Sequence, residues 1–441
     1  MHLIIRYSLV LLFSTLCTLS SWAQNDDLED LFADFEEEEE EVSPYTIKGF
    51  LDARFGPRIA QPAENPWYTL GEARGQFDFK YANNNLELAL VTDLKYSPLQ
   101  TEAFEDVENG VGILDIRELS FSKSIGTSFE LKAGRQILTW GTGDMLFIND
   151  LFPKDWKSFF SGRQINYLKA PSNSVKLSNF NKWFTLDLVW TPRFTSDRFI
   201  NGSNIEYFNP FMGGIVGESA MIQPSERNEY FTESEFSIRV HKVIKGVELD
   251  LYGYDGFWKT PEGFNDQGQF FFPQLSVIGA SLRTPLFTGV FNIEYGHYFS
   301  RDHENNKLKP IRNSEDRLLV GFEREIVKNF TASTQLYIEW INDFDSYLEN
   351  FEDFAFRDEV RTMLTLRLEY FALEQRLRFS FFNYYSPNEK DFFSKNTITF
   401  KYRDNLQLEL GSNYFTGKND FSFWGQFQTS SNIYAGLTWY Y

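Results

Sequence analysis

Apolar and charged residues alternate along much of this chain, and this alternation limits its possible folds more than any other feature. The segment LELALVTDL (86–94) has leucine at positions 86, 88, 90 and 94 and an acid at 87 and 93. The segment LTLRLEY (364–370) opposes leucines and a tyrosine to Arg367 and Glu369. A period of two is typical of β-strands, whose successive side chains point to opposite faces. The chain must therefore form sheets with one apolar face and one wet face.

Turn-forming residues divide the chain into about eighteen such segments, among them 374–385 and 396–403. Tight turns such as NNN (83–85) alternate with long links of about ten to forty residues, including 386–395. Tight turns at one end and long loops at the other are typical of outer-membrane barrels. We therefore predict an all-β fold for residues 45–441. It is a transmembrane antiparallel β-barrel of about eighteen strands, or sixteen, with short periplasmic turns and long extracellular loops.

The apolar residues are dispersed rather than gathered into spanning segments. No stretch after residue 24 approaches the ~18 consecutive apolar residues of a membrane helix, although Phe, Tyr and Trp make up 18% of the chain. A membrane barrel carries its hydrophobicity on every second residue, where an averaged hydropathy does not detect it. The alternative, a soluble β-sandwich, accounts neither for so many strands with a wet face nor for the two-sided loop pattern.

The chain ends in NIYAGLTWYY (432–441), which continues the alternation into the last residue. Leu437, Trp439 and Tyr441 share one face of this predicted strand, so they belong to the lipid face of a closing strand with interfacial rings. The segment resembles the C-terminal assembly signal of bacterial outer-membrane proteins. That resemblance implies recognition by the barrel-assembly machinery through these three residues.

The first 23 residues have the features of an export signal. Arg6 precedes the apolar run SLVLLFSTLCTL, and Ser-Trp-Ala at 21–23 matches a small-x-small cleavage site. We expect residues 1–23 to be removed on export. The only cysteine, Cys17, lies inside this signal, so the mature chain is expected to have no disulfide and no thiol metal ligand.

Residues 24–44 form an acidic tail. Its first eighteen residues hold eleven acids and no base, which is over half of the net charge of −20, and nucleic-acid binding is disfavoured. Leu28, Leu31, Phe32 and Phe35 have helical spacing. The tail is therefore either a disordered solvating segment or a short amphipathic helix that docks to a periplasmic partner or plugs the barrel from below.

Parity along the predicted strands also indicates which charged side chains face the lumen. The residues that we select are Arg74, Glu87, Lys132, Arg239, Glu339, Arg367, Arg376 and Arg378. Both signs occur together, which argues against a filter for ions of one sign and favours a polar pore or a wall lined with ion pairs. The alternative for each residue is that its charge is hydrated and only keeps the barrel wall in contact with water, without a role in selectivity.

The third long loop, 138–171, is the most distinctive segment. It combines Gly-rich turns with charged residues and many rings, and a loop so rich in rings would be poorly soluble if it extended into water. We expect it to fold into the barrel mouth and narrow the pore; an extracellular lid packed by its own side chains is the alternative. The candidate constriction residues are Arg135, Trp140, Asp144, Asp150, Lys154, Asp155 and Arg163.

The loop also carries two resemblances. Its place in strand order resembles that of the constriction loop in porins. The run GRQ (134–136), with Trp140-Gly141, Asp144, Pro153 and Asp155, resembles a motif in porin-like barrels of Gram-negative bacteria that are functionally uncharacterised, some encoded beside lipid-exporting inner-membrane pumps. The likeness covers about thirty residues. It implies a porin-like protein of the cell outer membrane.

Arg135 departs from the alternation of its strand. Phe129, Leu131 and Ala133 place it on the lipid side, where an arginine at the midplane costs ~2–4 kcal/mol. Either it lies above the hydrocarbon, or a bulge at Gly134 turns it inward. The bulge is our prediction.

Catalytic chemistry finds little support in the sequence. After the signal only His241, His297 and His303 remain. The first adjoins a predicted short turn, the second has the wrong parity to act with Ser300, and the third lies in a loop. No P-loop, zinc-spacing or nucleotide-binding motif is present. We expect no enzyme activity, no cofactor and no metal site.

Three functions remain open. The leading one is a channel for passive passage of small polar solutes. The second is the outer-membrane component of a transenvelope system that exports lipid or another hydrophobic compound, which would suit the acidic tail and the apolar third loop. The third is a surface adhesin or receptor that uses the long loop 192–232. Expected partners are outer-membrane lipid, the barrel-assembly machinery, small solutes and, in a homo-trimer, further copies of the chain.

Overall fold

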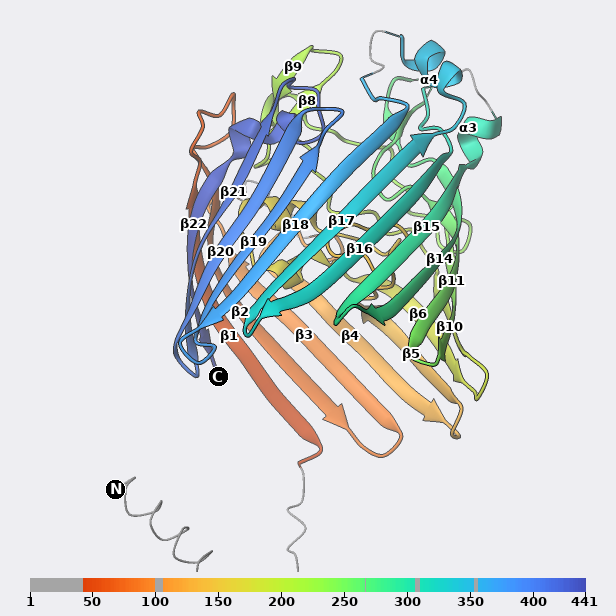
Figure 1. Ribbon diagram of the computed structural model, residues 1–441, viewed down its shortest axis with the longest axis vertical. Helices are drawn as coiled ribbons and strands as arrows, with labels where there is room; N and C mark the ends of the chain where they lie inside the picture. The colour runs from red at the N-terminus through yellow and green to blue at the C-terminus, as the bar shows by residue number, and fades with distance from the viewer. Residues whose placement is uncertain (1–42, 100–105, 266, 306–309, 353–355) are drawn as a thin grey trace, which may run out of the picture. The chain divides into compact units, whose positions relative to one another are not determined.

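Eighteen antiparallel strands close into one barrel in the computed structural model (Figure 1). The structure describes residues 43–99, 106–265, 267–305, 310–352 and 356–441. The expected export signal and all but the last two residues of the acidic tail fall outside these ranges. Strand β22 pairs with β1 from Phe50↔Tyr440 to Phe55↔Ala435, which closes the ring. The predicted all-β barrel of eighteen strands is confirmed.

The barrel strands follow the chain order. They are β1 (Tyr45–Pro57), β2 (Tyr68–Ala82), β3 (Leu86–Tyr96), β4 (Leu114–Ile125), β5 (Phe129–Gln136), β6 (Ser172–Phe180), β7 (Thr185–Thr191), β10 (Glu235–Ile244), β11 (Val247–Phe257), β14 (Gln274–Leu286), β15 (Gly289–Ser300), β16 (Glu315–Val327), β17 (Phe330–Ile341), β18 (Val360–Ala372), β19 (Leu377–Ser386), β20 (Asp391–Arg403), β21 (Leu406–Gly417) and β22 (Asn432–Tyr440).

The remaining elements lie in the loops. Among the described residues they are β8 (Tyr207–Asn209) with β9 (Gly214–Val216), β12 (Gly263–Phe264) with β13 (Phe270–Phe271), α2 (Trp156–Ser161), α3 (Arg301–Asn305), α4 (Phe344–Phe351), and 3₁₀ turns at Ile165–Leu168, Glu218–Ala220 and Gly425–Ser430. Across the residues that the structure describes, no helix is long and apolar enough to span a membrane.

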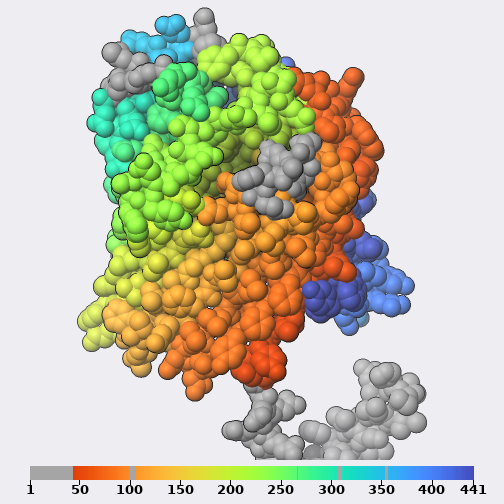
Figure 2. Space-filling view, turned by 180° about the vertical axis from the view of Figure 1, so that it is seen from behind, coloured from red at the N-terminus to blue at the C-terminus, as the bar shows by residue number. Residues whose placement is uncertain are grey.

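Turns and loops segregate to the two ends of the barrel (Figure 1). One end, the short-turn end, carries turns of two to four residues and the end of β22. The other, the long-loop end, carries the long connections, and Figure 2 shows green residues of the loops after β7 and β11 crowded there. The expected long link 386–395 is wrong. The connection is a four-residue turn, 387–390, because β20 begins at Asp391.

The two faces of the sheet differ in the way that alternation requires. Along β22, Ile433, Leu437 and Trp439 are exposed on the outer face, whereas Tyr434 points inward and is 1% exposed. The same contrast recurs around the ring, where exposed large apolar side chains alternate with buried inward ones. The outer face is therefore apolar, as a face in contact with lipid must be.

Candidate functional site

The connection between β5 and β6, residues 137–171, lies inside the barrel and is hereafter the third loop. Its main anchor is Glu294 of β15, which is 1% exposed. The carboxylate of Glu294 accepts hydrogen bonds from the backbone N–H of Thr142 at 2.6 Å, of Gly143 at 3.2 Å and of Asn149 at 2.8 Å. Several donors thus converge on one charged acceptor, and hydrogen bonds to charged groups are the stronger ones. They hold the first half of the loop against β15.

A second anchor comes from β18. Arg367 donates a hydrogen bond to Asp144 of the third loop at 2.7 Å, and it also pairs with Glu369 at 2.9 Å. The guanidinium therefore bridges the loop and the barrel wall. About a quarter of the Asp144 side chain remains exposed, so this ion pair is partly screened by water.

The second half of the loop is held by the opposite part of the ring. Arg163 pairs with Glu72 of β2, and the hydroxyl of Tyr167 donates to Asp93 of β3 at 2.8 Å. Since β2 and β3 are far from β15 and β18 in the ring order, the third loop crosses the lumen instead of following one wall.

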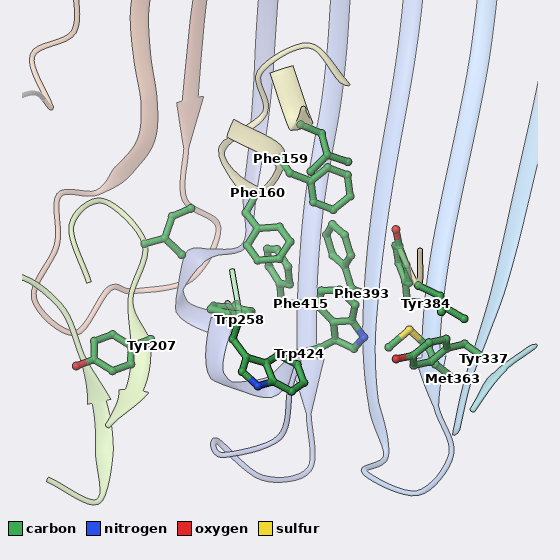
Figure 3. Packing of buried hydrophobic residues seen from close by; sticks show 14 of the residues in the cluster. Phe159, Phe160, Tyr207, Trp258, Tyr337, Met363, Tyr384, Phe393, Phe415 and Trp424 are labelled. Carbon is green, nitrogen blue, oxygen red and sulfur yellow. The ribbon is translucent and has the colours of Figure 1, made fainter. Parts of the chain in front are cut away.

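Aromatic side chains of α2 and of the strands facing it pack together near the long-loop end (Figure 3). Phe159 and Phe160 of α2 pack on Phe393 of β20 at ring-centre distances of 5.7 and 5.6 Å. Phe393 in turn stacks on Phe415 of β21 at 4.4 Å. Other buried members of this cluster are Tyr298, Leu319, Tyr337, Met363, Phe382, Tyr384, Trp424 and Phe427. The inward face of β19 to β21 is thus apolar near the long loops, whereas β16 and β17 carry the buried ion-paired carboxylates Glu315 and Glu339 at that end.

The long loop after β7, residues 192–234, contacts the third loop through Asp197 and Arg198. Arg198 forms two hydrogen bonds of 2.9 Å with Asp115 of β4 and one of 3.3 Å with Asp155. Burial alone would raise the pKa of Asp155, but the guanidinium groups of Arg198 and Arg163 and the N–H of Ser158 hold it below its usual value. Arg198 therefore joins three segments through charge-assisted hydrogen bonds.

The carboxylate of the neighbouring Asp197 also binds the third loop. It accepts hydrogen bonds from the backbone N–H of Lys154 and the indole Nε1 of Trp156, both at 2.8 Å. Burial raises the pKa of Asp197 to about 6 in spite of these donors. The carboxyl group consequently changes charge within the range of mildly acidic conditions.

A cavity of about 690 Å³ lies between the third loop and the barrel wall. Its wall side is formed by Arg239, Glu248, Asp250, Tyr252 and Arg283 of β10, β11 and β14. Its loop side includes the apolar residues Ile137, Trp140, Met145, Phe147, Ile165 and Leu168. Glu248 adjoins the two-residue turn 245–246, so this cavity is on the short-turn side of the loop. The cavity lining thus combines charged groups of both signs with apolar surface.

Six of the seven predicted constriction residues belong to the third loop, and most of them hold it in place. Trp140, Asp144 and Asp150 line the cavity. Lys154 is buried and pairs with Asp150 at 3.0 Å within the loop. Asp155 caps the N-terminus of α2 by accepting from the N–H of Ser158 at 2.7 Å, and Arg163 reaches β2 as described above.

Arg135 lies in β5 and not in the third loop, and the predicted bulge at Gly134 is wrong. Strand β5 pairs with β6 without a register shift from residue 129 to 136, although Gly134 has a φ of +118°. The guanidinium of Arg135 donates to the backbone carbonyls of Val107 at 3.1 Å and Glu108 at 2.8 Å. Arg135 is 7% exposed, and backbone carbonyls of residues 107 and 108 are its hydrogen-bond partners.

Most of the predicted lumen-facing residues form ion pairs in the structure. Six of them form ion pairs: Arg74 with Asp93 at 2.7 Å, Lys132 with Glu118 at 2.6 Å, Arg239 with Asp250 at 2.7 Å, Glu339 with Arg357, and Arg367 and Arg378 with Glu369. Glu87 has inward parity and is exposed near the short-turn end.

Arg376 does not face the lumen, so its prediction is wrong. It lies in the turn 373–376 and donates to the carbonyls of Lys401 and Tyr402 at 3.2 and 3.1 Å. The expected strand 374–385 begins only at Leu377, because the three residues before Arg376 all have positive φ.

The candidate assembly signal is on the outer face. Leu437, Trp439 and Tyr441 are all exposed there. The ring of Tyr441 lies 5.7 Å from that of Trp439, and its hydroxyl donates to the backbone carbonyl of Gln76 on β2 at 2.9 Å. The last residue thus reaches across β1 to the second strand.

Two residues that organise the site were not selected from the sequence. Alternation places Glu294 on the inward side of its strand, but its loop partners are about 145 to 152 positions away. Arg198 lies in a loop without regular periodicity, where no local pattern indicates a partner. Inward parity was the signal available for Glu294, and the sequence offered none for Arg198.

The closed barrel of eighteen antiparallel strands is an architecture that solved outer-membrane porins share. Among solved structures, the chain is similar to OccAB2 of Acinetobacter baumannii (TM-score 0.53, 9% identity, 90% of this chain and 98% of that one). OpdK of Pseudomonas aeruginosa gives a TM-score of 0.52 at 9% identity, and a BenF-like porin of Pseudomonas fluorescens gives 0.51 at 10%, each over 90% of this chain and 98% of the other. Identities this low show a shared fold alone. No family model and no curated protein sequence matches the chain.

Proposed function

We propose that this protein is an outer-membrane channel for small polar solutes, with the third loop as its constriction. The observation that carries the proposal is the loop itself, which is fixed across the lumen by Glu294 and Arg367 on one side and by Glu72 on the other. It leaves a cavity of about 690 Å³ with charges of both signs. In a barrel with a generic outer face, selectivity resides in such inward residues and loops.

The arrangement of charges supports passage with weak ion selectivity. Arg239 is neutralised by Asp250 on the wall, and Lys132 by Glu118 lower in the barrel. A ring of one sign would be needed to exclude ions of the other. In this proposal the short turns face the periplasm and the long loops face the outside, as in other barrels of this architecture.

The test is single-channel conductance of the refolded protein in a planar bilayer, repeated with residues 140–160 shortened. The proposal predicts conductance steps that become larger in the shortened form. A matched control shortens the tip 210–213 between β8 and β9, which includes the exposed Phe211 and Met212, and leaves the conductance unchanged. Absence of current from all three proteins, once a heat-resistant fold is confirmed for each, contradicts a channel.

The second candidate is the outer-membrane component of a system that exports a hydrophobic compound. It is favoured by the aromatic filling around Phe393 and Phe415 and by the apolar loop side of the cavity. This function predicts little current and an export defect when residues 24–41 are deleted. A diffusion channel predicts that the same deletion has little effect on conductance.

A further inference from the structure

A cluster of four polar side chains interrupts the apolar outer face of the barrel. Asn383 of β19, Ser394 and Asn396 of β20, and Ser412 of β21 share this face, and these three strands are neighbours (Figure 1). We call the four residues the polar island. Their sequence neighbours Phe382, Phe393 and Asn413, which have the opposite parity, are buried inside the barrel.

Apolar side chains border the polar island on both sides along each strand. Large residues at adjoining outward positions are exposed: Phe381, Tyr385, Ile398, Leu410, Tyr414 and Ile433. The island is therefore bordered by apolar and aromatic side chains, with Tyr385 and Phe392 between it and the turn 387–390. Polar side chains are costly in contact with hydrocarbon, and in membrane proteins they mark contacts with other polar groups.

Hydrogen bonds within the polar island use only some of the donor and acceptor groups of its four side chains. Ser394 Oγ lies 2.7 Å from Asn383 Oδ1 and 3.1 Å from Asn396 Oδ1, and its single proton serves these two acceptors. Asn396 Nδ2 donates to Ser412 Oγ at 3.2 Å. Among the described residues, the Nδ2 group of Asn383 has no hydrogen-bond partner. The island thus presents amide donors and shared acceptors outward.

We infer that the polar island is a contact site for a second copy of this chain, related by a two-fold axis along the membrane normal. A two-fold contact brings the same patch of both copies together. Each island carries both kinds of group that the other needs, since amide N–H of one copy can donate to the amide oxygen of the other. Acyl chains offer neither, which is why a polypeptide is the occupant that matches this surface.

The inference rests on the outer face being in lipid, and it is independent of channel activity. Cross-linking tests it with the full chain in outer-membrane vesicles. All proteins carry Cys17→Ser, which removes the only native cysteine. Ile398→Cys then places one thiol beside the island without altering it. Leu188→Cys is the matched control, because it is also outward and exposed and β7 lies nine strands from β20 in the ring.

A flexible bis-maleimide is expected to give a covalent dimer of the Ile398→Cys protein and at least tenfold less from the Leu188→Cys protein. Adding Asn383→Leu and Asn396→Leu to the first protein is expected to abolish the dimer while the barrel stays heat-resistant. Equal yields from both cysteines, a dimer that persists in the leucine variant, or an adduct only with another protein would each overturn the inference. A native mass spectrum with trimers and no dimers would overturn it as well.

Discussion

Glu294 and Asn149 form a two-point contact between the barrel wall and the third loop. The Glu294 carboxylate, on β15, accepts from the backbone N–H of Asn149 at 2.8 Å and from its side-chain amide at 3.0 Å. The same carboxylate accepts from Thr142 and Gly143. One side chain of the wall thus fixes both ends of the segment 142–149, and this relationship makes the position of the third loop testable.

Replacing Glu294 by glutamine is expected to release this segment. The substitution turns one acceptor into a donor that faces several N–H groups, and each hydrogen bond to a charged group contributes about 1.5–3 kcal/mol. We expect the free energy of local opening to fall by about 2–4 kcal/mol, which is roughly 30- to 900-fold faster amide exchange. Hydrogen exchange of a peptide that covers 142–149 measures it.

The control for this prediction is Glu323→Gln. Glu323 has inward parity on β16 but is exposed near the short-turn end, and it contacts no part of the third loop in the described structure. Exchange in 142–149 should not change in this variant. Equal acceleration in both variants would show that Glu294 acts through net charge and not as an anchor.

Local alternation predicts the strands and their faces, but it does not predict what meets inside the barrel. Period two is a property of neighbouring residues, so β22 and its outward rings follow directly from it. The partners Glu294 and Asn149 are 145 positions apart, and no local pattern relates them. Alternation also fails where both faces of a strand are apolar. Phe392 and Phe393 are adjacent and lie on opposite faces, so no period of two is visible there, and the predicted strand 396–403 begins five residues after the observed start of β20 at Asp391.

Arg135 shows a second limit of the same reasoning. Parity placed it on the lipid side, and the energetic conflict with lipid suggested a bulge at Gly134, which the strand register does not show. The structure resolves the conflict with the carbonyls of Val107 and Glu108, which come from a different loop. Which loop covers a residue depends on tertiary folding, so the sequence around Arg135 does not contain that information.

Asp144 and Arg367 should behave as an energetically coupled pair. Their hydrogen bond is 2.7 Å long, and the two side chains are 25% and 22% exposed, so screening by water limits their interaction to about 0.5–2 kcal/mol. A double-mutant cycle with Asp144→Asn and Arg367→Met, read by exchange of the same loop peptide, measures this coupling. Additive effects within about 0.4 kcal/mol would mean that Arg367 contributes through Glu369 alone.

Asp197 is expected to make the stability of the contact between the loop 192–234 and the third loop dependent on pH. Its pKa is raised by burial to about 6, so between pH 4 and 6 the folded state binds a proton that the unfolded state has lost. Stability therefore falls as pH rises through this window and is constant above it. The shift corresponds to at most about 3 kcal/mol at about 1.36 kcal/mol per pKa unit.

Hydrogen exchange of a peptide from 152–160, corrected for the intrinsic effect of pH, follows this change. The wild type should exchange more slowly at pH 4.5 than at pH 7. In Asp197→Asn the group cannot ionise, and the difference between the two pH values should disappear. An unchanged profile in the variant would assign the pH dependence to another group of the junction.

Tyr441 and Gly49 determine how the barrel closes on its outer face. A Cβ added at Gly49 would overlap the Tyr441 hydroxyl and the backbone carbonyl of Gln76, and the second atom has no freedom to move aside. Gly49→Ala is therefore expected to reduce the free energy of unfolding by about 1–3 kcal/mol. Gly214→Ala, where a Cβ would meet no atom within 4 Å, should leave it nearly unchanged.

Variants of Tyr441 distinguish its effect on the stability of the closed barrel from its effect on insertion of the barrel into the outer membrane. Tyr441→Phe keeps the ring beside Trp439 and loses only the hydrogen bond to Gln76, which is worth about 1 kcal/mol. Its urea midpoint after refolding should therefore fall slightly, with normal assembly in cells. Tyr441→Ser loses the terminal ring as well. If that ring is read by the assembly machinery, the amount of heat-resistant barrel in the outer membrane should fall far more than the refolding yield. A proportional loss in both measurements would instead show that Tyr441 acts only by stabilising the seam between β22, β1 and β2.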